Sequence, residues 1–240
     1  MKMEIPALTA AAFLLLAAPA VHADEPVKSA SADLDGDGKP EAISVQWAQG
    51  DAQFVLKVGG ATLRGKTNDA EVRGVTVIDV DGGDKWKEVA VDMGLTDDDH
   101  RSIVYGFDGK ALKELGSTHA LTEVRGNGIV LSDTWMGFWN LREKYALDRK
   151  AWKLNRVPQE LYFVGTEATV KQSFPILRST KDKAVVANLA EGSKIQVLAA
   201  TPEDPKTQDS WYLVKSSTGL LGWTRTQNLH DKTEGLPWAG

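Results

Sequence analysis

The chain contains no cysteine. It therefore forms no disulfide, offers no thiolate nucleophile and holds no cysteine-bound zinc. The same absence excludes a bacterial lipoprotein, because the lipid of those proteins is attached to a cysteine at the cleavage site. No block of basic residues is present and the formal net charge is −5. We therefore expect no nucleic-acid partner.

Long hydrophobic runs are also missing, so we expect no membrane span. The apolar run at 7–18 is too short to cross a bilayer, and no later stretch is longer. Lys2 precedes this run and small residues ending at Ala23 follow it, a pattern typical of a secretory signal peptide. We expect cleavage near Ala23 and a location in the periplasm or outside the cell.

Residues that would indicate catalysis are scarce. Beyond the expected signal peptide the histidines are His100, His119 and His230, all in expected loops, and no Gly-x-Ser-x-Gly motif occurs. The acidic pairs fall in turns that calcium or solvent explains. The sequence therefore favours a protein that is not an enzyme. A glycosidase stays open, because its two carboxylates need no sequence motif.

Acidic residues at alternate positions follow the first polar stretch of the chain. Asp33, Asp35 and Asp37 are followed by a glycine, and Glu41 comes three residues after that glycine. Calcium takes about six to eight oxygen ligands at about 2.3–2.6 Å, and this spacing lets one tight loop supply several of them. The carbonyl of Lys39 would be the main-chain ligand. We predict a structural Ca²⁺ here; an acidic turn without an ion is the alternative.

This loop leads into a strand and not into the helix of an EF-hand. Position twelve of the loop is Ser44 and not the bidentate Glu that an EF-hand requires. Ile43, Val45 and Trp47 alternate with small or polar residues, which predicts a β-strand. Further strands with glycine turns follow at close spacing, which favours an antiparallel meander.

The acidic pattern recurs about 46 residues later, within the range of β-propeller blades. Asp79 aligns with Asp33, Asp81 with Asp35, and Glu88 with Glu41 after one inserted residue. Asp84 keeps a fourth acid at an altered position. We therefore name Asp79, Asp81, Asp84 and Glu88 as a possible second metal site. The acids at 97–99 beside His100 are more typical of a solvated turn.

Residues 33–157 resemble the FG-GAP/VCBS family of β-propeller repeats. The shared features are the Asp-x-Asp-Gly-Asp-Gly loop, a Glu before a hydrophobic strand, and the Phe-Asp-Gly-Lys hairpin at 107–110. A third copy near 126–128 has lost its acids. A closed propeller typically has about four to eight blades, and this region has room for two or three. The resemblance therefore implies a partial, blade-like β-domain or one whose open edges are covered.

The last third of the chain resembles a bacterial Src-homology-3-like barrel. The marks are Leu177-Arg178-Ser179, a Gly-x-x-Ile-x-Val strand at 192–197, Trp-Tyr-x-Val at 211–214 and Gly-x-x-Gly-Trp at 219–223. Pro175 to Leu177 depart from the usual Leu-Asn-Val-Arg, which puts the ligand-facing side of that strand in doubt. The resemblance implies that Trp211, Tyr212 and Trp223 line a shallow binding groove.

The predicted fold is all-β: a propeller-blade-like antiparallel repeat domain and a small C-terminal barrel. Other tryptophans, such as Trp135, Trp139 and Trp152, fit a β-domain core better than a sugar-stacking platform. Whether the two modules pack together or swing about their linker stays open. The expected organisation is a signal peptide at 1–23, a flexible lead-in at 24–32, the repeat domain at 33–157, a linker at 158–165, the Src-homology-3-like domain at 166–230 and a tail at 231–240.

These features favour an exported binding or scaffold protein of the bacterial cell envelope. The barrel resemblance implies a cell-wall (peptidoglycan) peptide or an envelope protein as the partner. A polysaccharide-acting enzyme, or an accessory or inhibitor subunit of one, is the alternative. An inhibitor would present a protruding loop such as 201–210. The sequence does not indicate an oligomeric state.

Overall fold

A computed structural model describes residues 21–22, 26–96, 99–207 and 209–238. Strands account for 57% of the described residues and helix for 3%, and all three sheets are antiparallel, so the predicted all-β class is confirmed. None of the three sheets closes on itself. No helix among the described residues is long and apolar enough to cross a membrane. Most of the predicted signal peptide lies outside the described residues.

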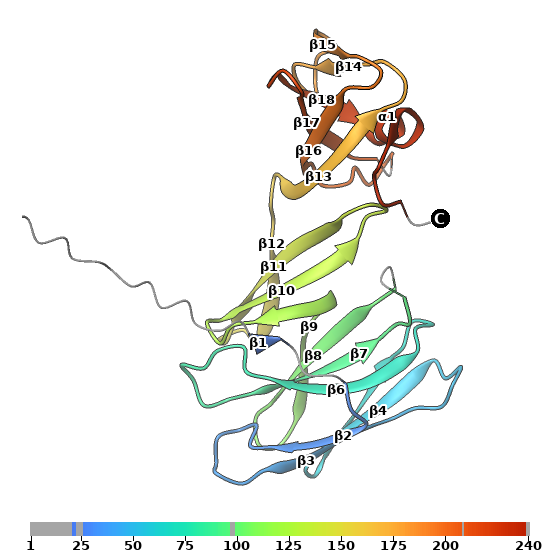
Figure 1. Ribbon diagram of the computed structural model, residues 1–240. Coiled ribbons are helices and arrows are strands. Elements are labelled where there is room, and N and C mark those ends of the chain that lie inside the picture. The colour runs from blue at the N-terminus through green and yellow to red at the C-terminus, as the bar shows by residue number, and fades with distance from the viewer. Residues whose placement is uncertain (1–20, 23–25, 97–98, 208, 239–240) are drawn as a thin grey trace, which may run out of the picture.

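Four strands form the first unit, at the bottom of Figure 1. They pair in chain order, and in the central two strands buried apolar residues alternate with more exposed residues. Ser29–Ala32 form an edge strand, whereas the sequence suggested a flexible lead-in there. Their hydrogen bonds to the next strand supply the order that this small, polar segment lacks by itself. The strands are β2 (Ser29–Ala32), β3 (Glu41–Gln46), β4 (Gln53–Val58) and β5 (Ala61–Lys66).

A longer sheet forms the second and third units. Its strands also pair in chain order, and one of them, β9 (Leu112–Val124), extends over 13 residues. Residues 112–119 of β9 pair with β8 (Arg101–Phe107), and residues 120–124 pair with β10 (Ile129–Trp135), so β9 closes the second unit and opens the third. β1 (Val21–His22) pairs with the end of β9. The strands are β6 (Val72–Ile78), β7 (Glu88–Met93), β8 (Arg101–Phe107), β9 (Leu112–Val124), β10 (Ile129–Trp135), β11 (Asn140–Asp148) and β12 (Lys153–Val157).

The three units stack face to face, and an apolar core fills each interface. The core between the first and second units includes Phe54, Leu56 and Tyr105, all fully buried. The core between the second and third units includes Val104 and Val130. Because side chains of a strand point alternately to its two faces, the second unit supplies residues to both cores.

Backbone hydrogen bonds repeat between units at the acidic loops. The carbonyl of Leu34 accepts from the Lys87 N–H at 3.0 Å, and the carbonyl of Val80 accepts from the Gly128 N–H at 2.7 Å. Leu34 and Val80 each follow the first Asp of a loop, and Lys87 and Gly128 each precede a strand. The segment at 126–128 therefore takes the same place as the acidic loop of the unit before it.

The C-terminal unit is a sheet of seven strands with one short helix. The sheet order is β15-β14-β18-β17-β16-β13-β19. The first strand begins at Tyr162, inside the predicted linker, because its first residues pair with the end of β16. The elements are β13 (Tyr162–Val170), β14 (Phe174–Leu177), β15 (Val185–Leu189), β16 (Lys194–Ala200), β17 (Trp211–Ser216), β18 (Leu221–Arg225), α1 (Thr226–Lys232) and β19 (Thr233–Glu234).

The predicted tail belongs to this unit as well. Thr233–Glu234 pair with the end of β13, and the ring of Trp238 lies 4.6 Å from that of Phe138 between centroids. Thr233 is buried, and so is Leu236. Residues 233–238 therefore pack on the C-terminal sheet.

The β10–β11 hairpin joins the third unit to the C-terminal unit. Phe138 and Trp139 at its tip are 1% and 4% exposed, and they share one core with Tyr162 and Tyr212. The Trp139 Nε1–H donates to the Tyr212 hydroxyl at 3.3 Å. The modules therefore pack against each other (Figure 1), which answers the question that the sequence left open.

Candidate functional site

The loop between β2 and β3 brings three predicted metal ligands together. Carboxylate oxygens of Asp33, Asp35 and Asp37 lie within 4.8 Å of one another, and these residues form the only such group within the described part of the chain. Two ligands of one calcium ion lie at most about 5 Å apart, which is twice the Ca–O distance. The observed spacing therefore suits a shared divalent cation.

Backbone N–H groups hold these carboxylates in place. Asp33 Oδ1 accepts from the Gly36 N–H at 2.8 Å, and Asp33 Oδ2 accepts from the Gly38 N–H at 2.9 Å. Asp35 accepts from the Asp37 N–H at 3.0 Å, and Asp37 from the Lys39 N–H at 2.8 Å. A carboxylate has about four lone-pair sites, so each oxygen pair retains acceptors for an ion.

Two further ligands were predicted, Glu41 and the carbonyl of Lys39, and the Glu41 carboxylate is not part of this group. The Glu41 Oε2 accepts from the Leu34 N–H at 2.8 Å, which closes the loop onto the start of β3. The Lys39 N–H is bound to Asp37, and its carbonyl stays a predicted ligand. In the second loop the Glu88 Oε2 accepts from the Val80 N–H at 3.1 Å. Glu41 and Glu88 therefore make equivalent bonds, as the alignment with one inserted residue predicts.

The first loop is packed against neighbouring loops of the second unit. A Cβ added at Gly36 would lie 2.6 Å from the backbone oxygen of Lys85, and one added at Gly109 would lie 2.5 Å from Asp35 Oδ2. Gly36 has φ of 68°, which favours glycine on its own account. The order of the first loop is therefore coupled to the second acidic loop.

In the second acidic loop an arginine supplies the positive charge. Arg149, in the turn between β11 and β12, donates from Nε to Asp84 and from Nη2 to Glu88, at 2.7 Å in both cases. Its guanidinium carbon lies 5.4 Å from the ring centroids of both Trp86 and Trp152. Asp84 and Glu88 thus share one positive charge that comes from within the chain. A metal ion at Asp79, Asp81, Asp84 and Glu88 stays a prediction.

Burial raises the pKa values of two carboxyl groups in this loop, Glu88 and Asp79. Burial raises the pKa of Glu88 above its ordinary value of 4.5, although the Val80 N–H and Arg149 act in the opposite direction. Burial also raises the pKa of Asp79, opposed by Lys87 and reinforced by Asp84 and Asp81. The structure therefore holds Glu88 in a place where its charged form depends on Arg149.

The three predicted groove residues of the C-terminal unit do not share one face. Tyr212 is 2% exposed and lies in the core. Trp211 and Trp223 are partly exposed on the other face of the sheet. The Arg225 guanidinium carbon lies 3.9 Å from the Trp211 ring centroid, and Arg225 also pairs with Asp209 at 3.1 Å. No such stack covers Trp223 among the described residues.

An apolar row crosses this outer face of the C-terminal sheet. Directly opposed residues of paired antiparallel strands point to the same face. The pairings place six at least partly exposed residues side by side, one from each of six neighbouring strands. Phe163 at one end is 80% exposed and Val185 at the other is 54% exposed. The apolar row consists of Phe163, Ala199, Leu213, Trp223, Leu177 and Val185.

Other residues singled out in the sequence have structural places. Trp139 is buried in the core, Trp152 packs beside Arg149, and Trp135 is partly exposed at the end of β10. Asp99 accepts from the Thr96 N–H at 2.7 Å, and the adjacent residues 97 and 98 lie outside the described residues. His230 is an exposed neighbour of Asp231, with Nδ1 at 2.8 Å from its carboxylate.

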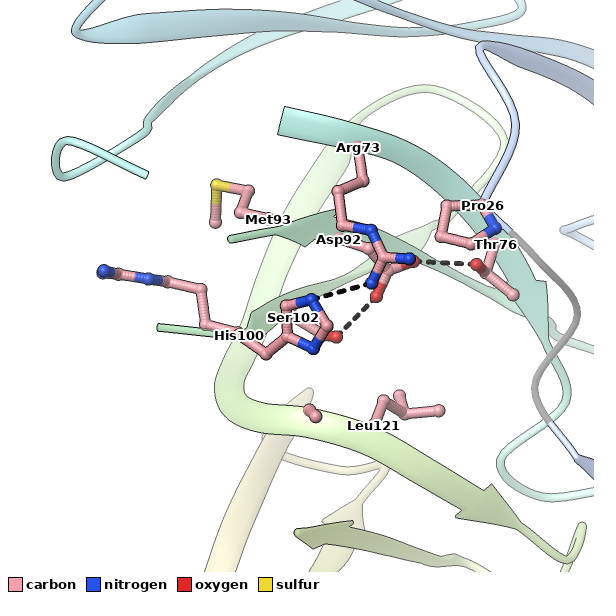
Figure 2. A pocket seen from close by; sticks show the side chains of 10 residues that line it. Pro26, Arg73, Thr76, Asp92, Met93, His100, Ser102 and Leu121 are labelled. Carbon is pink, nitrogen blue, oxygen red and sulfur yellow. Dashed lines mark hydrogen bonds between the residues drawn. The ribbon is translucent and has the colours of Figure 1, made fainter. Parts of the chain in front are cut away.

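Sequence reasoning missed a polar cavity beside β6, β7 and β8 (Figure 2). Arg73, Asp92, His100 and Ser102 line it, yet the Ser102 hydroxyl donates to Asp92 at 2.5 Å and His100 Nε2 faces Arg73. Serine and histidine are therefore not paired as nucleophile and base. The sequence could have indicated this cavity, because successive strands carry polar residues at inward-facing positions. Such positions are usually apolar on a buried sheet face.

Comparison with models of known protein families gave no match, and searches of curated proteins and of solved structures gave none either.

Proposed function

We propose that this protein is an exported, non-enzymatic binding or scaffold protein of the bacterial envelope, braced by calcium. In this proposal the three stacked units are blades of the FG-GAP/VCBS type, and the C-terminal unit is a Src-homology-3-like barrel. The equivalent bonds of Glu41 and Glu88 support the repeat relationship. The inter-unit bonds at Leu34 and Val80 support it independently.

Calcium has a structural role in this proposal. At about 5 Å each pair of carboxylates repels by about 1 kcal/mol in bulk water, and more near a protein surface. Asp33, Asp35 and Asp37 form three such pairs, and their loop contacts the second unit. A divalent ion would remove this repulsion and hold the entry to β3. At a free ion concentration tenfold above the dissociation constant, binding would stabilise the fold by about 1.4 kcal/mol.

The apolar row is the single observation that carries the binding role. Adjacent, partly exposed apolar side chains on one sheet face are characteristic of an interaction surface, and a tryptophan near the middle is a typical energetic anchor. In the proposal, a peptidoglycan peptide or a segment of an envelope protein lies across Trp223 and Leu213, towards Phe163.

Cosedimentation with purified sacculi tests this role. Wild-type protein is expected to sediment with them, and Trp223→Ala to lose most of its retention. Leu95→Ala removes a side chain that is 68% exposed in the second unit, and it is the matched control that retains binding. Protease-treated sacculi separate a peptidoglycan partner from a protein partner. No retention on either preparation, or equal retention of Trp223→Ala, contradicts the proposal.

A further inference from the structure

The interface between the second and third units changes character along its length. Near the acidic loops it is apolar, with Ile78, Val80 and Val130 buried. Towards the opposite end, inward positions of successive strands carry polar side chains, each with less than a tenth of its surface exposed. Burying a polar group costs free energy unless the group is hydrogen-bonded. The polar set is Thr76, Ser102, Thr118, Ser132 and Glu143.

Asp92 presents a carboxylate at this polar end. The Thr76 hydroxyl donates to its Oδ2 at 2.7 Å and the Ser102 hydroxyl donates to its Oδ1 at 2.5 Å. Both hydroxyls belong to buried residues, so the carboxylate is held in one orientation. No salt bridge joins Asp92 to a cation among the described residues. The two donors are neutral hydroxyls, so the carboxylate is left available to a cationic group of a ligand.

Arg73 brings an uncompensated positive charge to the same cavity. A register shift between Val72 and Gly74 places it in an irregular part of β6. Its Nη1–H donates to His100 Nε2 at 2.9 Å, so the imidazole accepts there. Among the described residues no carboxylate pairs with Arg73, and a guanidinium has five donors.

Both charges face one cavity of about 180 Å³ (Figure 2). Its polar lining consists of Arg73, Thr76, Asp92, His100, Arg101 and Ser102, and its apolar lining of Pro26, Met93, Ala120 and Leu121. Polar groups that converge on one concave site are typical of a small-molecule site. The Thr76 and Ser102 hydroxyls hold the Asp92 carboxylate in place. The contact with His100 holds the Arg73 guanidinium.

We propose that this cavity binds a free α-amino acid, with its ammonium group on Asp92 and its carboxylate on Arg73. A ligand with only one of the two charges leaves the other protein charge without a partner, so it binds more weakly. Arg73 can form a bidentate pair with a carboxylate, a geometry to which guanidinium is suited. The site lies in the repeat region, and it is independent of the calcium loop and of the apolar row.

Nuclear magnetic resonance titration of the full chain tests the inference. The common free amino acids are added singly at millimolar concentration, and the backbone amide signals of Gly74, Asp92 and Ser102 are followed. At least one amino acid is expected to shift these signals saturably. The analogue without the amino group and the analogue without the carboxylate are each expected to bind at least about tenfold more weakly than the amino acid itself.

Two variants and a matched control complete the test. Asp92→Asn and Arg73→Gln are each expected to weaken binding about tenfold or more. Arg178→Gln, which removes an exposed arginine of the C-terminal unit, leaves it unchanged. Arg73 is exposed, so its variant reports on binding even if Asp92→Asn unfolds. Absence of saturable shifts with every amino acid overturns the inference, and so does equal affinity of Arg73→Gln and wild type.

Discussion

Arg149 compensates the charge of the buried Glu88 carboxylate. Glu88 is fully buried, and its two oxygens are taken by the Val80 N–H and by the Arg149 guanidinium. An ionised carboxylate without such partners would cost several kcal/mol or become protonated. Trp86 and Trp152 confine the guanidinium, their ring centroids 5.8 Å apart. This cluster joins the second acidic loop to the β11–β12 turn.

Replacing Arg149 therefore has a large cost. Arg149→Gln is expected to lower the free energy of unfolding by about 3–5 kcal/mol, since it leaves Glu88 buried without its cation. Urea denaturation measures this difference. Arg178→Gln is the control, because its pair with Asp182 is exposed to solvent and contributes little to stability. Equal losses in the two variants would contradict the assigned role of Arg149.

The raised pKa of Glu88 predicts a pH dependence of stability. Above its ordinary value of 4.5, the folded protein retains a proton on Glu88 that the unfolded chain has lost. The folded state then binds more protons, so the free energy of unfolding falls as pH rises from 4.5 to the folded pKa. Glu88→Gln is expected to show a smaller fall in urea denaturation series across this range. Parallel pH profiles of the two proteins would contradict the prediction.

The residues of the first loop were predictable from the sequence because their relation is local. Asp33, Asp35 and Asp37 lie in one turn, so alternate spacing alone brings their oxygens together. Arg149 was not predictable, because it reaches Glu88 across 61 residues of chain and only the fold joins them. Glu143 interrupts an apolar strand face for a similar reason: its partner Arg156, at 2.5 Å, lies on the next strand.

The acidic loops couple one unit to the next through close backbone contact. Gly36 and Gly38 both have positive φ, 68° and 89°, so alanine is strained at either position. A Cβ at Gly36 would also meet the Lys85 backbone, whereas nothing lies within 4 Å at Gly38. The two glycines therefore separate the cost of loop conformation from the cost of contact between units.

Gly36→Ala is expected to destabilise the protein more than Gly38→Ala. The left-handed conformation costs an alanine about 1–2 kcal/mol at each position. The collision with Lys85 adds about 1–3 kcal/mol at Gly36 alone. Urea unfolding of both variants supplies the comparison, with Gly38→Ala as the matched control. A Gly36→Ala protein as stable as Gly38→Ala would show that the loops are not tightly packed.

Most strands were predictable because alternating apolar residues mark one buried face. Three features depended on tertiary pairing instead. Ser29–Ala32 carry small polar residues with little strand preference, and β3 orders them. β13 begins at Tyr162 because β16 lies beside it. The change of partner within β9 at residues 119–120 leaves no pattern in its own sequence.

The repeat region and the C-terminal unit are held together by one hairpin tip. Phe138 lies 5.5 Å from Tyr212 and 4.6 Å from Trp238 between ring centroids, and it comes from the third unit. The sequence indicated two β-modules but not this contact, since Phe138 and Trp238 lie far apart along the chain. An apolar tip buried in another unit fixes the orientation of the apolar row relative to the repeats.

Phe138→Ala is expected to uncouple the two parts. Removing a buried phenylalanine costs about 3–5 kcal/mol, and here the loss falls on the contact between units. We expect urea unfolding to separate into two transitions, seen by far-UV circular dichroism and tryptophan fluorescence. Phe163→Ala removes an exposed ring and is the control, with a change of about 0.5 kcal/mol or less. A single, merely shifted transition in Phe138→Ala would contradict independent units.

The dependence of the whole fold on a divalent ion is tested most directly by thermal unfolding of the full chain with EDTA and then with excess Ca²⁺. We predict that Ca²⁺ raises the midpoint of wild type by a few degrees, the shift expected from about 1–2 kcal/mol in a protein of this size. Asp35→Asn, which removes one of the three grouped carboxylates, is predicted to show little or no shift. An identical midpoint of wild type with EDTA and with Ca²⁺ would contradict the calcium-braced account.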